Sequence, residues 1–291
     1  MTSDRPTRRG SVTLGALVAA GTAMLRDGAV QEARREALRI VADLESWTPG
    51  EVVLAADKPA SDETVARCQA GFQRRAKGEP LAYVTGFAGF RHLVLKADRR
   101  ALIPRPETEG LVDVALGLTR TGVVVDVGTG TGCIALALRQ EGSFDRVIAV
   151  DWSLAALKLA EENRERLELE VELRQGDLLH GLGEGTLDLV VSNPPYVTSS
   201  EYRSLDAGVR EFEPELALVG GGDGLELYRR LFPQARLALK PRGWIAVELA
   251  ADRAHATARL ARLDGWDDVM LHLDLFGRLR YLTARRGDGR S

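Results

Sequence analysis

The chain has 291 residues, of which 45% are hydrophobic and 28% charged, enough apolar material for two domains or one large one. Its formal net charge of -3 leaves no basic surface of the kind that nucleic-acid-binding proteins carry, so we expect no direct nucleic-acid partner. The two cysteines are far apart and the four histidines are scattered, which favours neither a disulfide framework nor a metal site.

Residues 1–78 are predicted to form a small helical domain. Ser11 or Thr13 can cap a first helix. Residues 31–46 place apolar side chains at helical spacing, and a Thr-Pro-Gly sequence then breaks this second helix. A third helix is predicted over 61–77. The domain contains no catalytic group of residues, so a packing role and a partner-docking role both remain open.

The apolar run Leu14–Leu25 follows a polar, arginine-containing stretch, which is the order of charge and apolar residues in a signal peptide. The run is rich in alanine, has helical spacing and is too short to span a membrane. We therefore expect a cytoplasmic monomer without a membrane partner.

Residues 79–100 are predicted to form a β-hairpin that links the helical domain to the rest of the chain. Two runs of β-type residues around a glycine-rich turn lie here, within 79–90 and 92–95.

Pro104-Arg105-Pro106 follows the hairpin and forces an extended chain, because a residue before proline avoids the helical region. Arg105 is therefore presented rigidly, either to a ligand or to the carboxylate of Glu107 or Glu109. A helix is predicted to begin at Glu107 or Thr108.

Strands and helices alternate in the remaining sequence, which predicts an α/β domain over 101–291. Its sheet should be doubly wound and mostly parallel. The seven predicted strands are 123–127, 147–150, 171–173, 187–191, 244–249, 269–273 and 281–283. The predicted helices are 133–140, 153–166, 224–239, which Lys-Pro-Arg-Gly at 240–243 should end, and 252–263.

A glycine-rich turn, Gly128-Thr129-Gly130-Thr131-Gly132, follows the first of these strands. Such a turn lets a ligand approach the backbone closely. Asp151, about 20 residues further on at the end of the second strand, suits ribose hydroxyls. These features allow NAD, FAD or S-adenosylmethionine. The glycine spacing, with Cys133 where a dinucleotide motif has glycine, favours S-adenosylmethionine, whose amine could meet Asp126.

Asp177 and Leu178 at the end of the third strand extend this predicted cofactor site, with Leu178 packing on the adenine. Each assignment has an alternative. Asp151 could instead cap the helix that begins after Ser153, and Leu178 could be a core residue.

The turn Asn193-Pro194-Pro195-Tyr196 follows the buried strand 187–191, at the sheet edge where open α/β proteins bind ligands. Two consecutive prolines make this turn rigid. Asn193 offers one acceptor oxygen and two donors, and Tyr196 offers a flat ring with a polar tip. The turn therefore suits a planar group that carries an NH2, although a loop that only ends a strand is the alternative.

The runs Asp126–Gly132 and Asn193–Tyr196 resemble class I methyltransferases that act on planar amino or amide nitrogens. Four further runs are similar, more narrowly, to the peptide chain release factor glutamine methyltransferases: Leu81–Gly86, Leu102–Glu109, Phe212–Leu218 and Gly221–Leu225. The likeness is close over 79–249 and extends to the N-terminal helices only in outline. Glu248-Leu249-Ala250 departs from the family's usual Glu-Ile-Gly.

The resemblance implies methyl transfer from S-adenosyl-L-methionine to the glutamine of the Gly-Gly-Gln loop of release factors, with S-adenosyl-L-homocysteine as product. The separate helical pattern of the N-terminal domain and its lack of catalytic residues lead us to expect that it docks the release factor. Asn193, Pro194 and Tyr196 are the implied catalytic residues, and Pro195 and Arg105 join them in binding the substrate. The implied cofactor ligands are Asp126, Gly128, Thr129, Gly130, Thr131, Gly132, Asp151, Asp177, Leu178 and Asn193.

Two other classes of function remain open at this point. One is a methyltransferase for a ribosomal-protein glutamine or for a nucleic-acid amino group, although an adenine enzyme should show a basic channel and aromatic platforms. The other is a binding module that keeps the fold without the activity, which the intact glycine turn, Asp151 and Asn193 disfavour.

Overall fold

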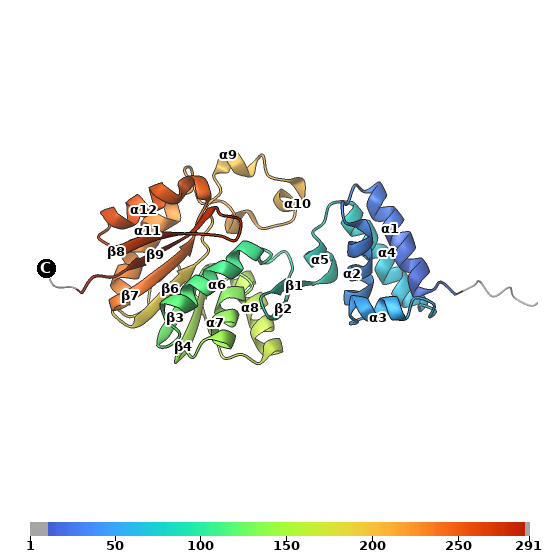
Figure 1. The fold of residues 1–291 in the computed structure, drawn as a ribbon, viewed down its shortest axis with the longest axis horizontal. Helices are drawn as coiled ribbons and strands as arrows, with labels where there is room; N and C mark the ends of the chain where they lie inside the picture. The colour runs from blue at the N-terminus through green and yellow to red at the C-terminus, as the bar shows by residue number, and fades with distance from the viewer. Residues whose placement is uncertain (1–10, 289–291) are drawn as a thin grey trace, which may run out of the picture. The chain divides into compact units, whose positions relative to one another are not determined.

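The computed structural model describes residues 11–288, which divide into two compact units between Phe87 and Ala88 (Figure 1). Each unit has its own hydrophobic core. Within the described residues, no helix combines the length and the apolar character needed to cross a membrane.

The first unit is a cluster of helices packed around Leu17, Ile40 and Phe72 (Figure 1). Its helices are α1 (Leu14–Asp27), α2 (Ala33–Leu44), α3 (Pro49–Leu54), α4 (Asp62–Ala76) and α5 (Leu81–Thr85). Thr13 caps α1, as the sequence indicates. The predicted break after α2 is present, but Pro49 also begins α3, because Thr48 and Glu51 form a capping box there.

The prediction of β-type structure within 79–90 is wrong for its first part, because Leu81–Thr85 forms helix α5. Gly86 ends this helix in the left-handed conformation, at φ +81°. The hairpin itself follows as β1 (Phe87–Phe90) and β2 (Leu93–Lys96), which form a two-stranded sheet. Its turn is made by Arg91 at φ +51° rather than by the glycines.

The second unit contains a seven-stranded sheet in the order β5-β4-β3-β6-β7-β9-β8. Its strands are β3 (Val123–Val127), β4 (Arg146–Asp151), β5 (Glu172–Gln175), β6 (Leu187–Ser192), β7 (Leu239–Glu248), β8 (Asp267–Leu273) and β9 (Leu279–Arg285). The pairs from β5 to β7 are parallel, and β9 is antiparallel to both of its neighbours. The predicted doubly wound, mostly parallel sheet is confirmed.

Helices cover both faces of this sheet (Figure 1). Val125 and its neighbours on one face pack against α11 (Glu226–Ala238) and α12 (Ala254–Leu263). Val124 and its neighbours on the other face pack against α6 (Pro106–Leu118) and α7 (Cys133–Glu141). The remaining helices are α8 (Leu154–Leu167), α9 (Ser199–Tyr202), α10 (Ala207–Arg210) and the 3-10 turns η1 (Glu215–Ala217) and η2 (Ala251–Arg253). Successive side chains along a strand therefore pack against the helical layers on opposite faces of the sheet.

Strand β7 begins earlier than predicted. The sequence Lys240-Pro241-Arg242-Gly243 was expected to separate helix from strand, but it lies within β7, where the pairing with β6 shifts in register. The register also aligns the strand ends: Val127 lies beside Val150 and Ser192, and Ser192 lies beside Val247. The residues that follow these strands therefore meet at one edge of the sheet, on both sides of the point where the strand order reverses.

Candidate active site

A cavity of about 360 Å³ lies at this edge of the sheet, a volume typical of small-molecule sites. Ten residues predicted from the sequence line it: Arg105, Gly128, Thr129, Gly130, Thr131, Asp151, Asp177, Leu178, Asn193 and Pro195. Four others are not among its lining residues: Asp126, Gly132, Pro194 and Tyr196. Four residues that were not predicted as site residues also line the cavity: Thr108, Trp152, Leu216 and Arg230.

The glycine turn follows β3 with Gly128, Gly130 and Gly132 all at positive φ, between +56° and +85°. The backbone N–H groups of Gly128 and Thr129 both donate to the Val150 carbonyl on β4, at 2.8 and 3.0 Å. A Cβ atom added to Gly128 would meet no protein atom within 4 Å. A side chain there would therefore enter space that the protein leaves free beside the cavity.

Asp126 lies beneath this turn and is fully buried. Its Oδ2 accepts hydrogen bonds from Thr129 Oγ1 at 2.6 Å and from the Ala135 N–H at 3.2 Å. Its Oδ1 is buried and has no hydrogen-bond partner within the described residues. Burial raises the pKa of Asp126 to about 7. Asp126 thus ties the turn to the start of α7 and keeps one carboxylate oxygen unused.

Asp151 at the end of β4 uses both carboxylate oxygens on backbone groups. Oδ2 accepts from the Gly130 N–H at 2.9 Å, and Oδ1 accepts from the Ser153 N–H at 2.8 Å. Burial raises the pKa of Asp151, although these backbone donors act in the opposite direction. The helix-capping alternative is therefore also realised, since Asp151 contacts the start of α8 while it lines the cavity.

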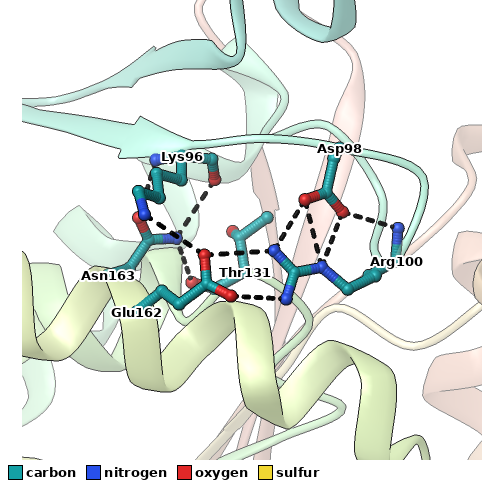
Figure 2. A network of polar contacts seen from close by, with 6 residues as sticks. All are labelled: Lys96, Asp98, Arg100, Thr131, Glu162 and Asn163. Atoms are coloured by element: carbon teal, nitrogen blue, oxygen red, sulfur yellow. Dashed lines mark hydrogen bonds and ion pairs between the residues drawn. The ribbon is translucent and has the colours of Figure 1, made fainter.

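Behind the turn, Asn163 on α8 connects the cavity wall to the β-hairpin (Figure 2). Its Nδ2 donates to the carbonyls of Thr131 at 3.0 Å and Lys96 at 3.1 Å, and its Oδ1 accepts from the Lys96 N–H at 2.6 Å. Asn163 is fully buried. The adjacent Glu162 reaches outward to Arg100, with which it forms an ion pair at 2.6 Å (Figure 2). An asparagine inside a helix gives no sequence signal for this role.

Asp177 and Leu178 lie at the far wall of the cavity. Asp177 forms an ion pair with Arg230 at 2.5 Å, so its carboxylate already has a partner. Trp152, directly after Asp151, lines the cavity with 64% of its surface exposed. An exposed tryptophan beside a cavity offers a flat apolar surface to a ring system.

At the opposite wall, Asn193 follows β6 and contacts Thr108 on α6. The Asn193 Nδ2 donates to Thr108 Oγ1 at 3.0 Å, and Thr108 Oγ1 donates to Glu248 Oε2 at 2.7 Å. Thr108 and Glu248 are 2% and 1% exposed. Burial raises the pKa of Glu248 to about 7. The three side chains form one hydrogen-bonded chain from the strand end of β7 to the cavity.

Tyr196 directs its hydroxyl to Glu248 Oε1 at 3.4 Å, and its ring packs on the core. Burial, reinforced by the Glu248 charge, raises the pKa of Tyr196 to about 12, so the hydroxyl stays protonated. Pro194 is buried, while Pro195 lines the cavity. The stacking role of Tyr196 and the acceptor role of the Pro194 carbonyl stay predictions.

The turn after β6 is packed against glycines that the sequence analysis did not connect to it. A Cβ on Gly220 would lie 2.2 Å from the Pro195 carbonyl oxygen, and one on Gly224 would lie 2.3 Å from the Tyr196 carbonyl oxygen. Neither contact leaves room for a side chain. The glycine-rich run around 220–224 therefore supports the turn from behind.

Arg105 pairs with neither Glu107 nor Glu109. Its guanidinium instead contacts Glu213 Oε1 at 2.6 Å, while Glu213 Oε2 accepts from the Ile103 N–H at 3.2 Å. Glu213 is 5% exposed, so this pair is well shielded. Glu107 and Glu109 belong to helix α6, which begins at Pro106, and Glu109 Oε1 accepts from the Arg91 N–H at 2.8 Å.

Comparisons with known proteins agree with this architecture. A methyltransferase small domain matches residues 108–210, and a PrmC N-terminal domain matches residues 16–86. A solved methyltransferase from Pyrococcus furiosus has the same fold, with a TM-score of 0.52 and 22% identity over 66% of this chain and 88% of that chain. The fold and the site define a class I S-adenosylmethionine-dependent methyltransferase.

Curated relatives narrow this class. Release factor glutamine methyltransferase from Streptomyces coelicolor is 39% identical, with 92% of this chain and 96% of the relative covered. The enzymes of that name from Geobacter sulfurreducens and Deinococcus radiodurans are 39% and 41% identical, over 79% and 77% of this chain and 82% and 81% of the relatives. The chain belongs to the release factor glutamine methyltransferase family.

Proposed function

We propose that this protein transfers a methyl group from S-adenosylmethionine to the side-chain amide nitrogen of the glutamine in the Gly-Gly-Gln loop of peptide chain release factors. Family membership supports the substrate. One observation carries the chemistry: at the cavity wall opposite Asp151, the amide of Asn193 donates to Thr108 and keeps its own oxygen available. That oxygen is an acceptor suited to an NH2 group.

The residues of the cavity wall that contains Gly128 and Asp151 fit S-adenosylmethionine, which supplies an electrophilic methyl group when bound. Gly128 leaves open space beside its backbone, and Asp151 presents a carboxylate toward the cavity, which suits ribose hydroxyls. Asp126 has one unpaired oxygen and a pKa raised to about 7, and a neighbouring ammonium group would stabilise its charged form. Trp152 and Leu178 offer apolar surface for the adenine. The expected product is S-adenosylhomocysteine.

On the substrate side, the task is orientation. A glutamine nitrogen is a weak nucleophile because its lone pair is delocalised, so its alignment with the methyl group governs the rate. Asn193 Oδ1 and the Pro194 carbonyl would accept the two amide hydrogens and stabilise positive charge that develops on nitrogen. Pro195 lines the binding surface, and Tyr196 would stack on the amide. Arg105, fixed by Glu213, would border the entrance. The proton leaves the nitrogen after transfer.

The test is to incubate the protein with S-adenosylmethionine and a purified release factor and to locate added methyl groups by mass spectrometry. We expect one methyl group on the glutamine of the Gly-Gly-Gln loop and none on a release factor in which that glutamine is alanine. Methyl groups found instead on a ribosomal protein or on nucleic acid would select the alternative substrates. Binding of S-adenosylmethionine without transfer of its methyl group would support the alternative of a binding module without enzymatic activity.

We also propose that the helical unit docks the release factor, and that the protein works as a cytoplasmic monomer. The exposed Leu54 at the end of α3 supports docking, because 90% of its surface is accessible. Leu54→Ser should raise KM for the release factor and leave cofactor affinity unchanged. Leu263→Ser, at the end of α12 with 75% exposure, is the matched control. Equal KM values in both variants would argue for a packing role of this unit.

A further inference from the structure

The amide group of Asn193 has two possible orientations, and only one serves the proposed reaction. With Nδ2 toward Thr108, as in the structure, Oδ1 is the free end of the amide. Within residues 11–288, this oxygen accepts no hydrogen bond. With the amide reversed, the cavity would receive an NH2 group, which repels the hydrogens of a substrate amide. Something must therefore select the orientation.

The selection follows from the single proton of the Thr108 hydroxyl. A hydroxyl donates one hydrogen bond and accepts others. Thr108 Oγ1 donates to Glu248 Oε2 at 2.7 Å, because an ionised carboxylate can only accept. Toward Asn193, at 3.0 Å, the hydroxyl can then only accept. This requires the NH2 group of Asn193 to face Thr108.

We infer that Thr108 and Glu248 are positioning residues that fix the amide orientation of Asn193, so that its oxygen faces the substrate nitrogen. The catalytic significance of this orientation rests on the proposed function. Burial makes the constraint effective: with Thr108 2% and Glu248 1% exposed, water cannot replace either partner. The Tyr196 hydroxyl donates to the other Glu248 oxygen and so favours the same carboxylate state.

Thr108→Val removes the hydroxyl and keeps the shape, while Thr108→Ser keeps the hydroxyl. We expect kcat to fall by about tenfold to a hundredfold in Thr108→Val, as for a misplaced group at a reacting centre. The Kd for S-adenosylmethionine should change less than threefold, and Thr108→Ser should retain most of kcat. If Thr108 acted only through the packing of its methyl group, Thr108→Val would retain kcat and Thr108→Ser would lose it. Equal kcat values in the folded valine and wild-type proteins would overturn the inference.

A second measurement does not depend on activity. The chain contains only two asparagines, Asn163 and Asn193, so selective ¹⁵N-asparagine labelling of the full-length protein gives two side-chain NH2 signals. Asn163 is an internal reference, because its Nδ2 donates to the carbonyls of Lys96 and Thr131 and not to Thr108. Hydrogen exchange of the Asn193 NH2 group should be slowed in the wild-type and serine proteins and fast in the valine protein.

Methylation activity tests the proposed function, and hydrogen exchange of the Asn193 NH2 group tests the amide orientation. Slow exchange that is lost only in Thr108→Val, with no methylation of a release factor by the wild-type protein, would refute the proposed function and retain the orientation. Methylation by the wild-type protein, with identical Asn193 exchange in all three proteins, would refute the orientation and retain the function.

Discussion

The two walls of the cavity are built in different ways. The cofactor wall uses backbone groups and local contacts: Asp126 bonds to Thr129 and to Ala135, and Asp151 bonds to Gly130 and Ser153. The amide wall uses side chains from distant segments, in which Thr108 contacts Asn193 and Glu248 across 85 and 140 residues. The cofactor wall therefore rests on two carboxylates that accept mostly from nearby backbone N–H groups, whereas the amide wall depends on side chains that only the fold brings together.

Asn193→Ala removes the end of the amide wall and should have the largest effect. We expect kcat to fall by about 10²–10³, the usual loss of one preorganised group aimed at developing charge. The Kd for S-adenosylmethionine should change little. Asn193→Asp should be equally slow, because a carboxylate cannot donate to Thr108 and attraction to the ground-state sulfonium does not favour the transition state. Near wild-type turnover in a folded Asn193→Ala protein would contradict this assignment.

Gly220→Ala tests whether the amide wall depends on the turn behind it. The new Cβ would lie 2.2 Å from the Pro195 carbonyl oxygen, so the turn that carries Asn193 must shift. A displacement of about 1 Å at a reacting centre costs up to about 10² in rate, and we expect a kcat loss of that order. Gly222→Ala is the control, since its Cβ would meet no atom within 4 Å. Steady-state kinetics in which both variants behave alike would remove this role of Gly220.

These contrasts also explain what the sequence could predict. The glycine turn, Asp151 and the turn at Asn193 follow strand ends, and alternating apolar runs locate those ends. Glu248 was visible only as the residue that the run Glu248-Leu249-Ala250 shares with the family's Glu-Ile-Gly, because its partners depend on which strands become neighbours. Thr108 appeared only as a possible helix start. The error at Leu81–Thr85 has a local cause, since a five-residue apolar run is compatible with helix or strand until Gly86 ends it.

Asp151→Ala tests the cofactor wall and should weaken binding rather than turnover. Each charge-assisted hydrogen bond that is lost, worth about 1.5–3 kcal/mol, should raise the Kd for S-adenosylmethionine about tenfold to a hundredfold. The Gly130 N–H also loses its partner, which loosens the turn. Asp151→Asn keeps one acceptor oxygen without the charge, so its Kd should lie between those of the wild-type and Asp151→Ala proteins. Calorimetry that finds wild-type affinity in Asp151→Ala would exclude the ribose role.

The network of Figure 2 offers a comparison of a buried contact with an exposed one on adjacent residues. Asn163→Ala would leave the Lys96 N–H and two carbonyls without partners, which should lower the free energy of unfolding by about 1–3 kcal/mol. Glu162→Ala removes two partly exposed ion pairs, with Arg100 and Lys96, each worth about 0–1 kcal/mol. Denaturant titration should rank Asn163→Ala as the less stable protein. The opposite ranking would show that the outer ion pairs hold the hairpin.

The smallest expected effect is a pH dependence that belongs to the amide wall alone. Burial raises the pKa of Glu248 to about 7, so the carboxylate takes up a proton as the pH falls through this value. A protonated Glu248 can donate to Thr108, whose hydroxyl is then free to donate to a reversed Asn193 amide. The titratable groups around Glu248 are Glu107 on α6, Cys133 on α7, Tyr196, Tyr228 on α11, and Arg280 and Tyr281 on β9.

With a pKa of about 7, the ionised fraction of Glu248 falls from about nine-tenths at pH 8 to about one-tenth at pH 6. We therefore expect kcat at saturating substrates to fall by up to about tenfold over this range. The tyrosines stay protonated and Arg280 stays charged, so neither contributes. Asp126 also has a pKa raised to about 7, and Asp126→Asn should keep the fall if it arises at Glu248. Glu248→Gln should have a lower but flat profile, because an amide does not titrate. An acid limb that survives in Glu248→Gln and disappears in Asp126→Asn would move the titration to the cofactor wall.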